Sequence, residues 1–173
     1  MGANAIVVNG LPGVGKSTLA AALAHELGFP VVSKDAIKEA LADVVAVPLP
    51  TSRVGAIASD TLWALARLID GPVIVESFWF SGRDDAFFEQ GLSTAGVVGG
   101  VEIWCDAPVE IVRQRFHTRP RHPVHDEAQR QGDWEEWALH ARPISTFPVL
   151  RVNTSSPVDI PRLATQLLHQ LPH

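Results

Sequence analysis

The stretch IVVNGLPGVGKSTLAAAL, from Ile6 to Leu23, joins an apolar run, a glycine-rich break and an alanine-rich segment. The apolar run is typical of a buried β-strand and the alanine-rich segment of an α-helix. Between them, Gly10 to Ser17 satisfies the pattern G-x-x-x-x-G-K-[ST] in the strand-to-helix context that it requires. Glycines let backbone N–H groups turn inward around phosphate oxygens, and the helix adds the positive end of its dipole. The stretch therefore predicts a binding site for a nucleoside triphosphate, with ATP as the expected nucleotide.

Two side chains of this loop have separate expected roles. Lys16 is expected to contact the β- and γ-phosphates, and Ser17 to ligate Mg²⁺. A turn that only caps a helix would not explain a lysine followed by a hydroxyl. The predicted nucleotide-binding residues are Gly10, Leu11, Pro12, Gly13, Val14, Gly15, Lys16, Ser17 and Thr18.

Further apolar runs recur along the chain, with room for a helix between each pair. They are short, β-branched and nearly continuous, which favours strands that are covered on both faces of a parallel sheet. The predicted strands are Ala5 to Asn9, Phe29 to Ser33, Pro72 to Ser77, Gly100 to Asp106 and Phe147 to Asn153. Five strands separated by helices predict an α/β layered fold.

Three helices are predicted from apolar spacing and terminal residues. The first, Lys16 to Leu27, stops at Gly28, a residue suited to a helix C-terminus. The last has Ser156 as its expected N-cap and Pro157 as its first helical residue. The middle helix, Ser52 to Ile69, has an apolar face made of Val54, Ile57, Ala58, Leu62, Leu65 and Leu68.

The segment from about residue 117 to residue 143 fits no strand pattern. It is rich in arginine, histidine and proline, and a short helix is expected around Asp133 to His140. Near its start, four arginines fall within nine residues: Arg113, Arg115, Arg119 and Arg121. Such a group suits a lid that closes on phosphate charge, although a solvated helix face is the alternative. We expect a mobile lid over one end of the sheet, within a single domain that covers residues 1–173.

Composition limits the class of protein. A chain of 173 residues is the size of one domain with one core. The formal net charge of −5 disfavours nucleic acid or an anionic membrane as a partner. A single cysteine, Cys105, excludes an internal disulfide. No apolar run approaches the roughly 18 residues needed to span a bilayer, so we expect a cytoplasmic protein that is neither secreted nor embedded in a membrane.

Four segments of the chain resemble the small P-loop kinases of the nucleotide-kinase-like group, and within it the chloramphenicol phosphotransferases and related ATP-binding proteins. These segments are GLPGVGKST, VVSKDAIKEAL, EIWCDAPVEIVRQRFHTR and VLRVNTSSPVDI. The first is highly specific, and together they extend the resemblance along nearly the whole chain. The resemblance implies the three-layer P-loop NTPase fold, with a five-stranded parallel sheet in the order 2-3-1-4-5.

The resemblance also implies roles for residues outside the loop. Asp35 corresponds to the aspartate that faces the phosphate loop and acts as base on the substrate hydroxyl; the alternative is a carboxylate that stabilises a helix start. Arg115 and Arg119 correspond to arginines that contact phosphates or stack near the adenine. Glu76 ends the third strand, where the family often has an aspartate, and is expected to contact substrate or the outer sphere of Mg²⁺.

Aromatic and basic residues after the third strand are candidates for contacts with the acceptor. Phe78, Trp79 and Phe80 either line an acceptor pocket or pack in the core. Arg53 and Arg83 are candidates for binding an acceptor phosphate. The predicted substrate-binding residues are Asp35, Glu76, Trp79 and Arg83.

Two groups in the lid have simpler explanations than a binding site. His122, His125 and Asp126 loosely match a metal site, but no further ligand cluster accompanies them. Trp134 and Trp137 are three residues apart and are expected on one packed helix face rather than on a base-stacking platform.

These features predict an enzyme that transfers the γ-phosphoryl group of ATP to a hydroxyl of a small molecule. ATP and Mg²⁺ are the expected cofactors, and Asp35, Lys16, Arg115 and Arg119 the expected catalytic residues. The resemblance implies an antibiotic or a nucleoside- or sugar-like acceptor. The alternatives are a nucleoside monophosphate kinase and a switch protein that hydrolyses ATP without phosphorylating anything. A polynucleotide kinase is disfavoured by the negative charge and the lack of a basic stripe.

Overall fold

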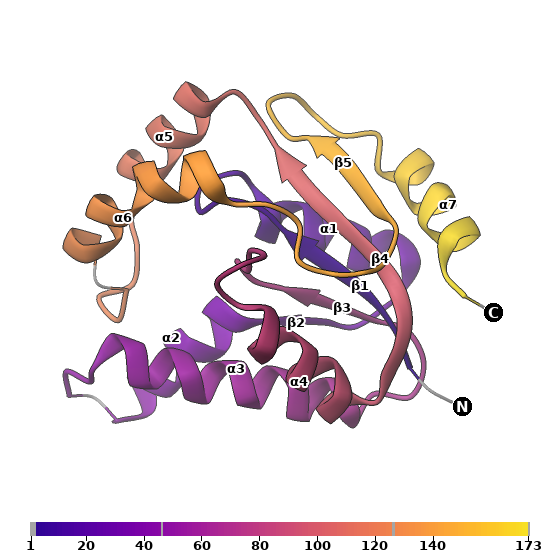
Figure 1. Cartoon of the computed structure of the whole chain (residues 1–173), viewed down its shortest axis with the longest axis horizontal. Coiled ribbons are helices and arrows are strands. Elements are labelled where there is room, and N and C mark those ends of the chain that lie inside the picture. Colours follow the sequence, from indigo (N-terminus) through magenta and orange to yellow (C-terminus); the bar gives the residue numbers. More distant parts are fainter. Residues whose placement is uncertain (1–2, 46, 126, 173) are drawn as a thin grey trace.

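Five parallel strands form one sheet at the centre of the molecule (Figure 1). The computed structural model describes residues 3–45, 47–125 and 127–172, and only the backbone of residues 127–131. The strand order is β2-β3-β1-β4-β5. The strands are β1 (Ala3–Asn9), β2 (Val31–Ser33), β3 (Val73–Glu76), β4 (Val97–Asp106) and β5 (Val149–Asn153). The predicted fold class, strand number and strand order are therefore confirmed.

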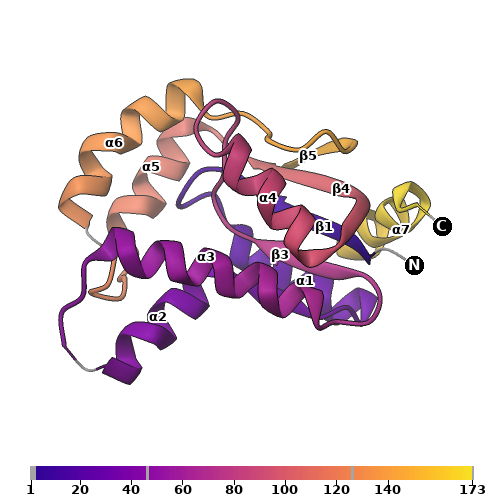
Figure 2. The same ribbon diagram turned by 60° about the horizontal axis from the view of Figure 1, so that its bottom comes forward.

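Helices cover both faces of this sheet and one of its ends. In Figures 1 and 2, α5 and α6 lie beyond the carboxyl ends of the strands, and α2, α3 and α4 lie on the opposite side from α1 and α7. The helices are α1 (Lys16–Leu27), α2 (Lys34–Val45), α3 (Thr51–Arg67), α4 (Asp85–Ala95), α5 (Val109–Thr118), α6 (Glu127–His140) and α7 (Ile160–Gln170). No helix in the described residues is long and apolar enough to cross a membrane.

Strand β1 explains why the predicted strands are continuous apolar runs. Ile6 and Val8 face a core that includes residues of α1, α5, α6 and α7. Ala5 and Val7 face a second core that includes residues of α3 and α4. All four side chains are fully buried. Because both faces of the strand are covered from Ala5 to Val8, this part of it is a continuous apolar run rather than an alternation of apolar and polar residues.

Both predicted ends of α1 hold, the predicted ends of α3 shift from Ser52 and Ile69 to Thr51 and Arg67, and the predicted start of α7 is wrong. Helix α1 has its predicted bounds, and Gly28 follows it in the left-handed conformation with φ of 68°. Helix α7 begins at Ile160 rather than Pro157, and its cap is Asp159 rather than Ser156. The Asp159 carboxylate accepts a hydrogen bond from the N–H of Arg162 at 3.1 Å. A carboxylate at this position satisfies the first turn of the helix, so a serine three residues earlier is not needed.

The predicted apolar face of α3 is partly wrong. Ile57, Leu65 and Leu68 are exposed, whereas Trp63 and Ala66 are buried. The helix packs on β2 and β3 and beside α4, which turns the row through Val54, Ala58, Leu62 and Ala66 inward.

The helical content around the lid and after β3 is greater than predicted. Helix α6 begins at Glu127, six residues before the predicted short helix, and α4 was not predicted. The α4 sequence contains Gly91, Ser93 and Thr94, which have low helix propensity. Gly91 is required by packing, because a Cβ there would lie 2.1 Å from the indole nitrogen of Trp63.

Candidate active site

The loop between β1 and α1 has a backbone that requires glycine. Gly10 and Gly13 have φ of 138° and 94°. A Cβ on Gly10 would lie 2.6 Å from the carbonyl oxygen of Cys105, and one on Gly13 would lie 2.9 Å from that of Val112. Both the conformation and the close approach to β4 and α5 therefore exclude a side chain. The motif in the sequence corresponds to a loop packed tightly on the sheet.

Lys16 is folded back onto this loop. Its ammonium group donates to the carbonyl of Gly10 at 2.9 Å and to that of Leu11 at 3.1 Å. The side chain is buried, and its residue is the first of α1. The positive charge is therefore held at the loop and at the N-terminus of a helix, where an anion is favoured.

Residues from α5, from α6 and from the β5–α7 connection hold the outer side of the loop. The indole N–H of Trp134 donates to the carbonyl of Pro12 at 3.3 Å, and the hydroxyl of Thr154 donates to that of Val14 at 2.6 Å. Arg115 donates to the carbonyl of Thr154 at 3.1 Å. Trp134 is buried in the core, which confirms its expected packing role. Trp134 and Thr154 thus bind carbonyl groups on the outer side of the loop, and the inner side stays available to an anion.

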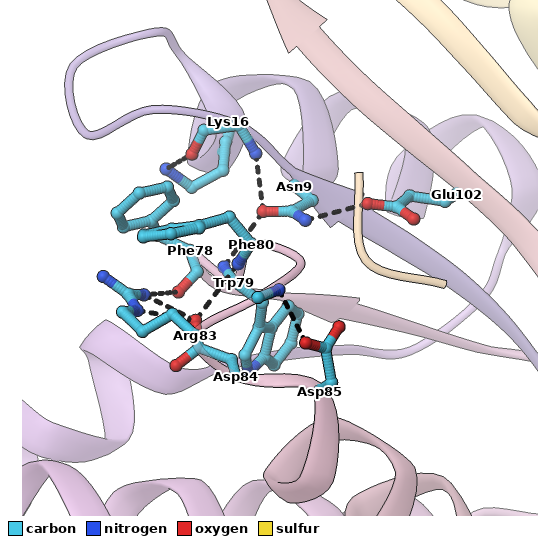
Figure 3. A network of polar contacts seen from close by, with 11 residues as sticks. Asn9, Lys16, Phe78, Trp79, Phe80, Arg83, Asp84, Asp85 and Glu102 are labelled. Carbon is cyan, nitrogen blue, oxygen red and sulfur yellow. Dashed lines mark hydrogen bonds and ion pairs between the residues drawn. The ribbon is translucent and has the colours of Figure 1, made fainter. Parts of the chain in front are cut away.

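A buried amide links the loop to the segment after β3 (Figure 3). The side-chain oxygen of Asn9 accepts from the N–H of Gly10 at 2.7 Å and from that of Trp79 at 3.1 Å. The amide nitrogen donates to Glu102 at 2.8 Å. Glu102 is fully buried and accepts from the N–H of Ser145 at 2.8 Å. Sequence reasoning missed this network, although a glutamate inside the apolar run GVEIWCD was a signal for it.

Glu76 lies beneath the loop at the carboxyl end of β3. It is 2% exposed, and the hydroxyl of Ser33 donates to it at 2.6 Å. Burial raises the pKa of the Glu76 carboxyl, and the charge of Asp35 raises it further. Lys16 and the hydrogen bonds from Ser33 and Ser17 oppose that shift of the pKa. Glu76, Ser17 and Lys16 therefore form one electrostatic unit.

A cleft of about 1080 Å³ opens above these groups. It lies at the carboxyl ends of the strands, where open α/β sheets bind ligands. The predicted site residues that line it are Pro12, Gly13, Gly15, Lys16, Ser17, Asp35, Glu76, Trp79, Arg83 and Arg119. Those outside its lining are Gly10, Leu11, Val14, Thr18 and Arg115. The phosphate loop and the residues after β2, β3 and α5 therefore converge on one cavity.

Asp35 occupies the first turn of α2, directly after β2. It lines the cleft, and its charge acts on Glu76. A carboxylate in a first turn also interacts favourably with the helix dipole. The position thus suits both of the roles considered for Asp35.

The aromatic residues after β3 divide between the cleft and the core. Trp79 is 3% exposed and stacks on Trp63 at 5.7 Å, while one side of it reaches the cleft. Phe78 lines the cleft, and Phe80 does not. Arg53, on α3, is also outside the lining.

Arg83 lines the cleft beside these rings, already paired with a carboxylate. Its Nη2 donates to Asp84 at 2.6 Å, and Nε donates to the same oxygen at 2.9 Å. This ion pair balances the charge of the guanidinium group that faces the cleft.

The segment between α5 and α6 is attached to α2 through two histidines. His122 pairs with Asp43 and His125 with Glu39, both at 2.9 Å. Of the three residues that loosely match a metal site, Asp126 lies outside the described residues, and among those described no group of three potential metal ligands is present. The histidines instead connect the α5–α6 segment to α2 at the cleft wall, where His122, His125 and Glu39 are lining residues.

Comparisons with known proteins agree with this architecture. The family described as "AAA domain" matches residues 6–143. A shikimate kinase of Bradyrhizobium diazoefficiens is 30% identical over 155 residues, which cover 88% of this chain and 72% of that protein. A proposed kinase from Chloroflexus aurantiacus has a TM-score of 0.86 at 28% identity, over 99% of this chain and 100% of that chain. The tunicamycin resistance protein of Deinococcus radiodurans shares the fold, with a TM-score of 0.57 at 21% identity over 99% of each chain. These matches confirm the resemblance drawn from the sequence.

Proposed function

The chain belongs to the AAA domain family, and from that premise we propose that it is an ATP-dependent phosphotransferase that phosphorylates a hydroxyl of a small molecule. The observation that carries the proposal is the meeting of Lys16 and Asp35 in one cleft. Lys16 belongs to the phosphate loop. Asp35 lies in the first turn of α2, directly after β2. Transfer from a nucleotide needs a cation on the phosphates and a group that receives the acceptor proton, and these two side chains supply them.

In this proposal the phosphate loop binds ATP. Its backbone N–H groups and Lys16 contact the phosphates, and Lys16 exchanges its bonds to Gly10 and Leu11 for them. The residues present fit Mg²⁺, because Ser17 and the buried carboxylate of Glu76 offer the oxygen ligands that this ion prefers. When bound with ATP, the ion would neutralise phosphate charge. Ser17 would coordinate the ion directly, and Glu76 would contact its outer coordination sphere.

Asp35 acts as the general base of the proposed reaction. It accepts the proton of the acceptor hydroxyl, whose oxygen forms a bond to the γ-phosphorus while the bond to the β–γ bridging oxygen breaks. ADP leaves, and Arg119 stabilises the charge on the transferring group from the cleft wall. Arg115 lies outside the cleft lining and would act on nucleotide binding through Thr154, whose hydroxyl donates to the carbonyl of Val14 in the loop.

The proposed acceptor is an antibiotic or a nucleoside- or sugar-like compound, contacted by Glu76, Trp79 and Arg83. A nucleoside monophosphate kinase is less well supported, because it needs free arginines for the acceptor phosphate. Arg83 is paired with Asp84, and Arg53 lies outside the cleft lining.

We propose that nucleic acid is not a partner, since the net charge is −5. We also propose the cytoplasmic location that is expected from the sequence.

The direct test is a screen for ATP consumption across antibiotics, nucleosides and sugars, with mass detection of the added phosphoryl group. Asp35→Asn then separates a kinase from an ATP-hydrolysing switch. The variant should keep its fold and its affinity for Mg·ATP, and lose about 10²-fold or more in transfer, because asparagine cannot accept the proton.

A carboxylate that only stabilises α2 predicts a different result for Asp35→Asn. Stability would fall by about 1 kcal/mol or less and turnover would hardly change, since asparagine is itself a good residue at a helix start. Thermal midpoint, Mg·ATP affinity and transfer rate, measured on this one variant, distinguish the two. Normal turnover per folded molecule would refute the role of Asp35 as base.

A further inference from the structure

Phe78 lies between two of the basic side chains that line the cleft, Lys16 and Arg83. The ammonium group of Lys16 lies 5.8 Å from the centre of its ring, and the guanidinium carbon of Arg83 lies 4.8 Å from it. Figure 3 shows the ring below Lys16 and above Arg83. The side chain is partly buried and lines the cleft. An apolar group therefore lies beside the lysine that the proposed function assigns to the phosphates.

Neighbouring side chains hold this ring in place. Trp137 of α6 packs on it with ring centres 5.3 Å apart, and Phe80 lies at 5.6 Å. Arg83 donates to the carbonyl of Phe78 at 3.3 Å and to Asp84 at 2.6 Å. The lid helix and the β3–α4 connection thus fix the ring from two sides. The ring is therefore packed into the wall of the cleft on two sides.

We infer that Phe78 covers the transferring phosphoryl group against water and so favours the acceptor hydroxyl as nucleophile. The inference rests on the proposed function. In productive transfer, the acceptor oxygen bonds to the γ-phosphorus as the bond to ADP breaks. In the competing hydrolysis, a water oxygen forms that bond, and ADP, inorganic phosphate and a proton are released.

The physical reason lies in the chemistry of the side chain. A phenyl ring offers no conventional hydrogen bond that could orient a water molecule, and its face attracts the neighbouring cations. Excluding water from a closed site also strengthens the electrostatic interactions inside it and prevents hydrolysis of the reactive group. By excluding water beside Lys16, Phe78 can strengthen these electrostatic interactions and prevent hydrolysis. The charged and hydroxyl groups elsewhere in the cleft bind water and cannot exclude it.

The test needs no knowledge of the acceptor, because its probe is Mg·ATP alone. Phe78→Ala should raise acceptor-independent ATP hydrolysis by about fivefold or more, since the missing ring admits water. Calorimetric affinity for Mg·ATP should stay within about twofold, because the loop is unchanged. Phe87→Ala is the matched control: it removes the same type of ring from the lining of the same cleft, but from an exposed position on α4 rather than from beside Lys16. Its hydrolysis rate should equal that of the unsubstituted protein.

Phe78→Leu protects the test against misfolding. Leucine keeps much of the apolar cover, so hydrolysis should lie between the rates of the unsubstituted protein and Phe78→Ala. If the alanine variant has no cooperative thermal transition, the leucine variant decides the question. Unchanged or lower hydrolysis with intact Mg·ATP binding would overturn this inference alone. Failure of the unsubstituted protein to bind Mg·ATP would overturn the proposed function, and the inference with it.

Discussion

The two halves of the cleft are built in different ways. The phosphate half is one contiguous loop between β1 and α1, and glycines determine its shape. The other half, where we propose that the acceptor binds, is called the acceptor half. It is assembled from α2, α3, α4, the β3–α4 connection, residues 119–122, His125, Asp133 and Trp137, which meet only in the folded molecule (Figure 2). A loop of fixed shape suits a constant donor such as ATP, whereas walls from several segments can vary with the acceptor. The difference predicts that substitutions in the two halves will affect different kinetic constants.

Lys16→Ala tests the phosphate half and should have the largest effect. We expect phosphoryl transfer to fall by about 10³-fold, and Mg·ATP binding to weaken, because the cation is lost while the loop backbone remains. Transfer assays and calorimetry measure the two effects, and the thermal midpoint shows whether the loop survives without the bonds to Gly10 and Leu11.

Lys34→Ala is the matched control for Lys16→Ala. Lys34 lines the acceptor side of the same cleft, at the start of α2. Its loss should leave Mg·ATP affinity unchanged. Near-full activity of Lys16→Ala, or an equal loss of Mg·ATP affinity in both variants, would remove the distinction between the halves.

The same division explains how much could be predicted from the sequence. The phosphate loop was predictable because its glycines, its lysine and its hydroxyl are adjacent in the chain and their conformations are local. The parallel sheet was predictable because strands covered on both faces are continuous apolar runs. The strand order followed from the resemblance and not from the apolar pattern.

The acceptor half and its supports depend on pairs that are distant in the sequence. His125 meets Glu39 across 86 positions, and Asn9 meets Glu102 across 93. Single-sequence patterns record spacing within an element and not such partners. Lys16 could therefore be assigned a role from the sequence, whereas Phe78 could only be named as either cleft or core.

Arg119 and Arg115 allow a finer comparison, because the resemblance gave them one role and the structure places them differently. Arg119 lines the cleft, whereas Arg115 donates to Thr154, which supports the loop at Val14. We expect Arg119→Ala to lower kcat by about tenfold with little change in Mg·ATP Kd, as for a charge that acts mainly in the transition state. Arg115→Ala should mainly weaken Mg·ATP binding. If Arg119→Ala lowers only nucleotide affinity, its proposed role is wrong.

The smallest expected effect concerns Glu76, where the two halves meet. Burial raises the pKa of this carboxyl above its usual 4.5. Above pH 4.5 the unfolded chain carries this charge more readily than the folded protein does, so the buried carboxyl costs stability there relative to a neutral side chain. Glu76→Gln removes the charge and can still accept the hydrogen bond of Ser33. At pH 7 we expect the thermal midpoint to rise by about 3 °C, as for a gain of about 1 kcal/mol in a chain of this length.

The dependence on pH identifies the cause of that gain. Above the raised pKa, Glu76 is ionised in both the folded and the unfolded state, and the gain from glutamine is complete. As the pH falls through the raised pKa toward 4.5, the folded protein takes up the proton first and the gain shrinks. Below 4.5 both states are protonated, and the midpoints of variant and unsubstituted protein should coincide. A gain that persists at pH 4 would mean that glutamine improves packing. If that gain is as large as the gain at pH 7, the charge of Glu76 costs the folded state no stability, and the destabilisation attributed here to burial of this carboxylate is wrong.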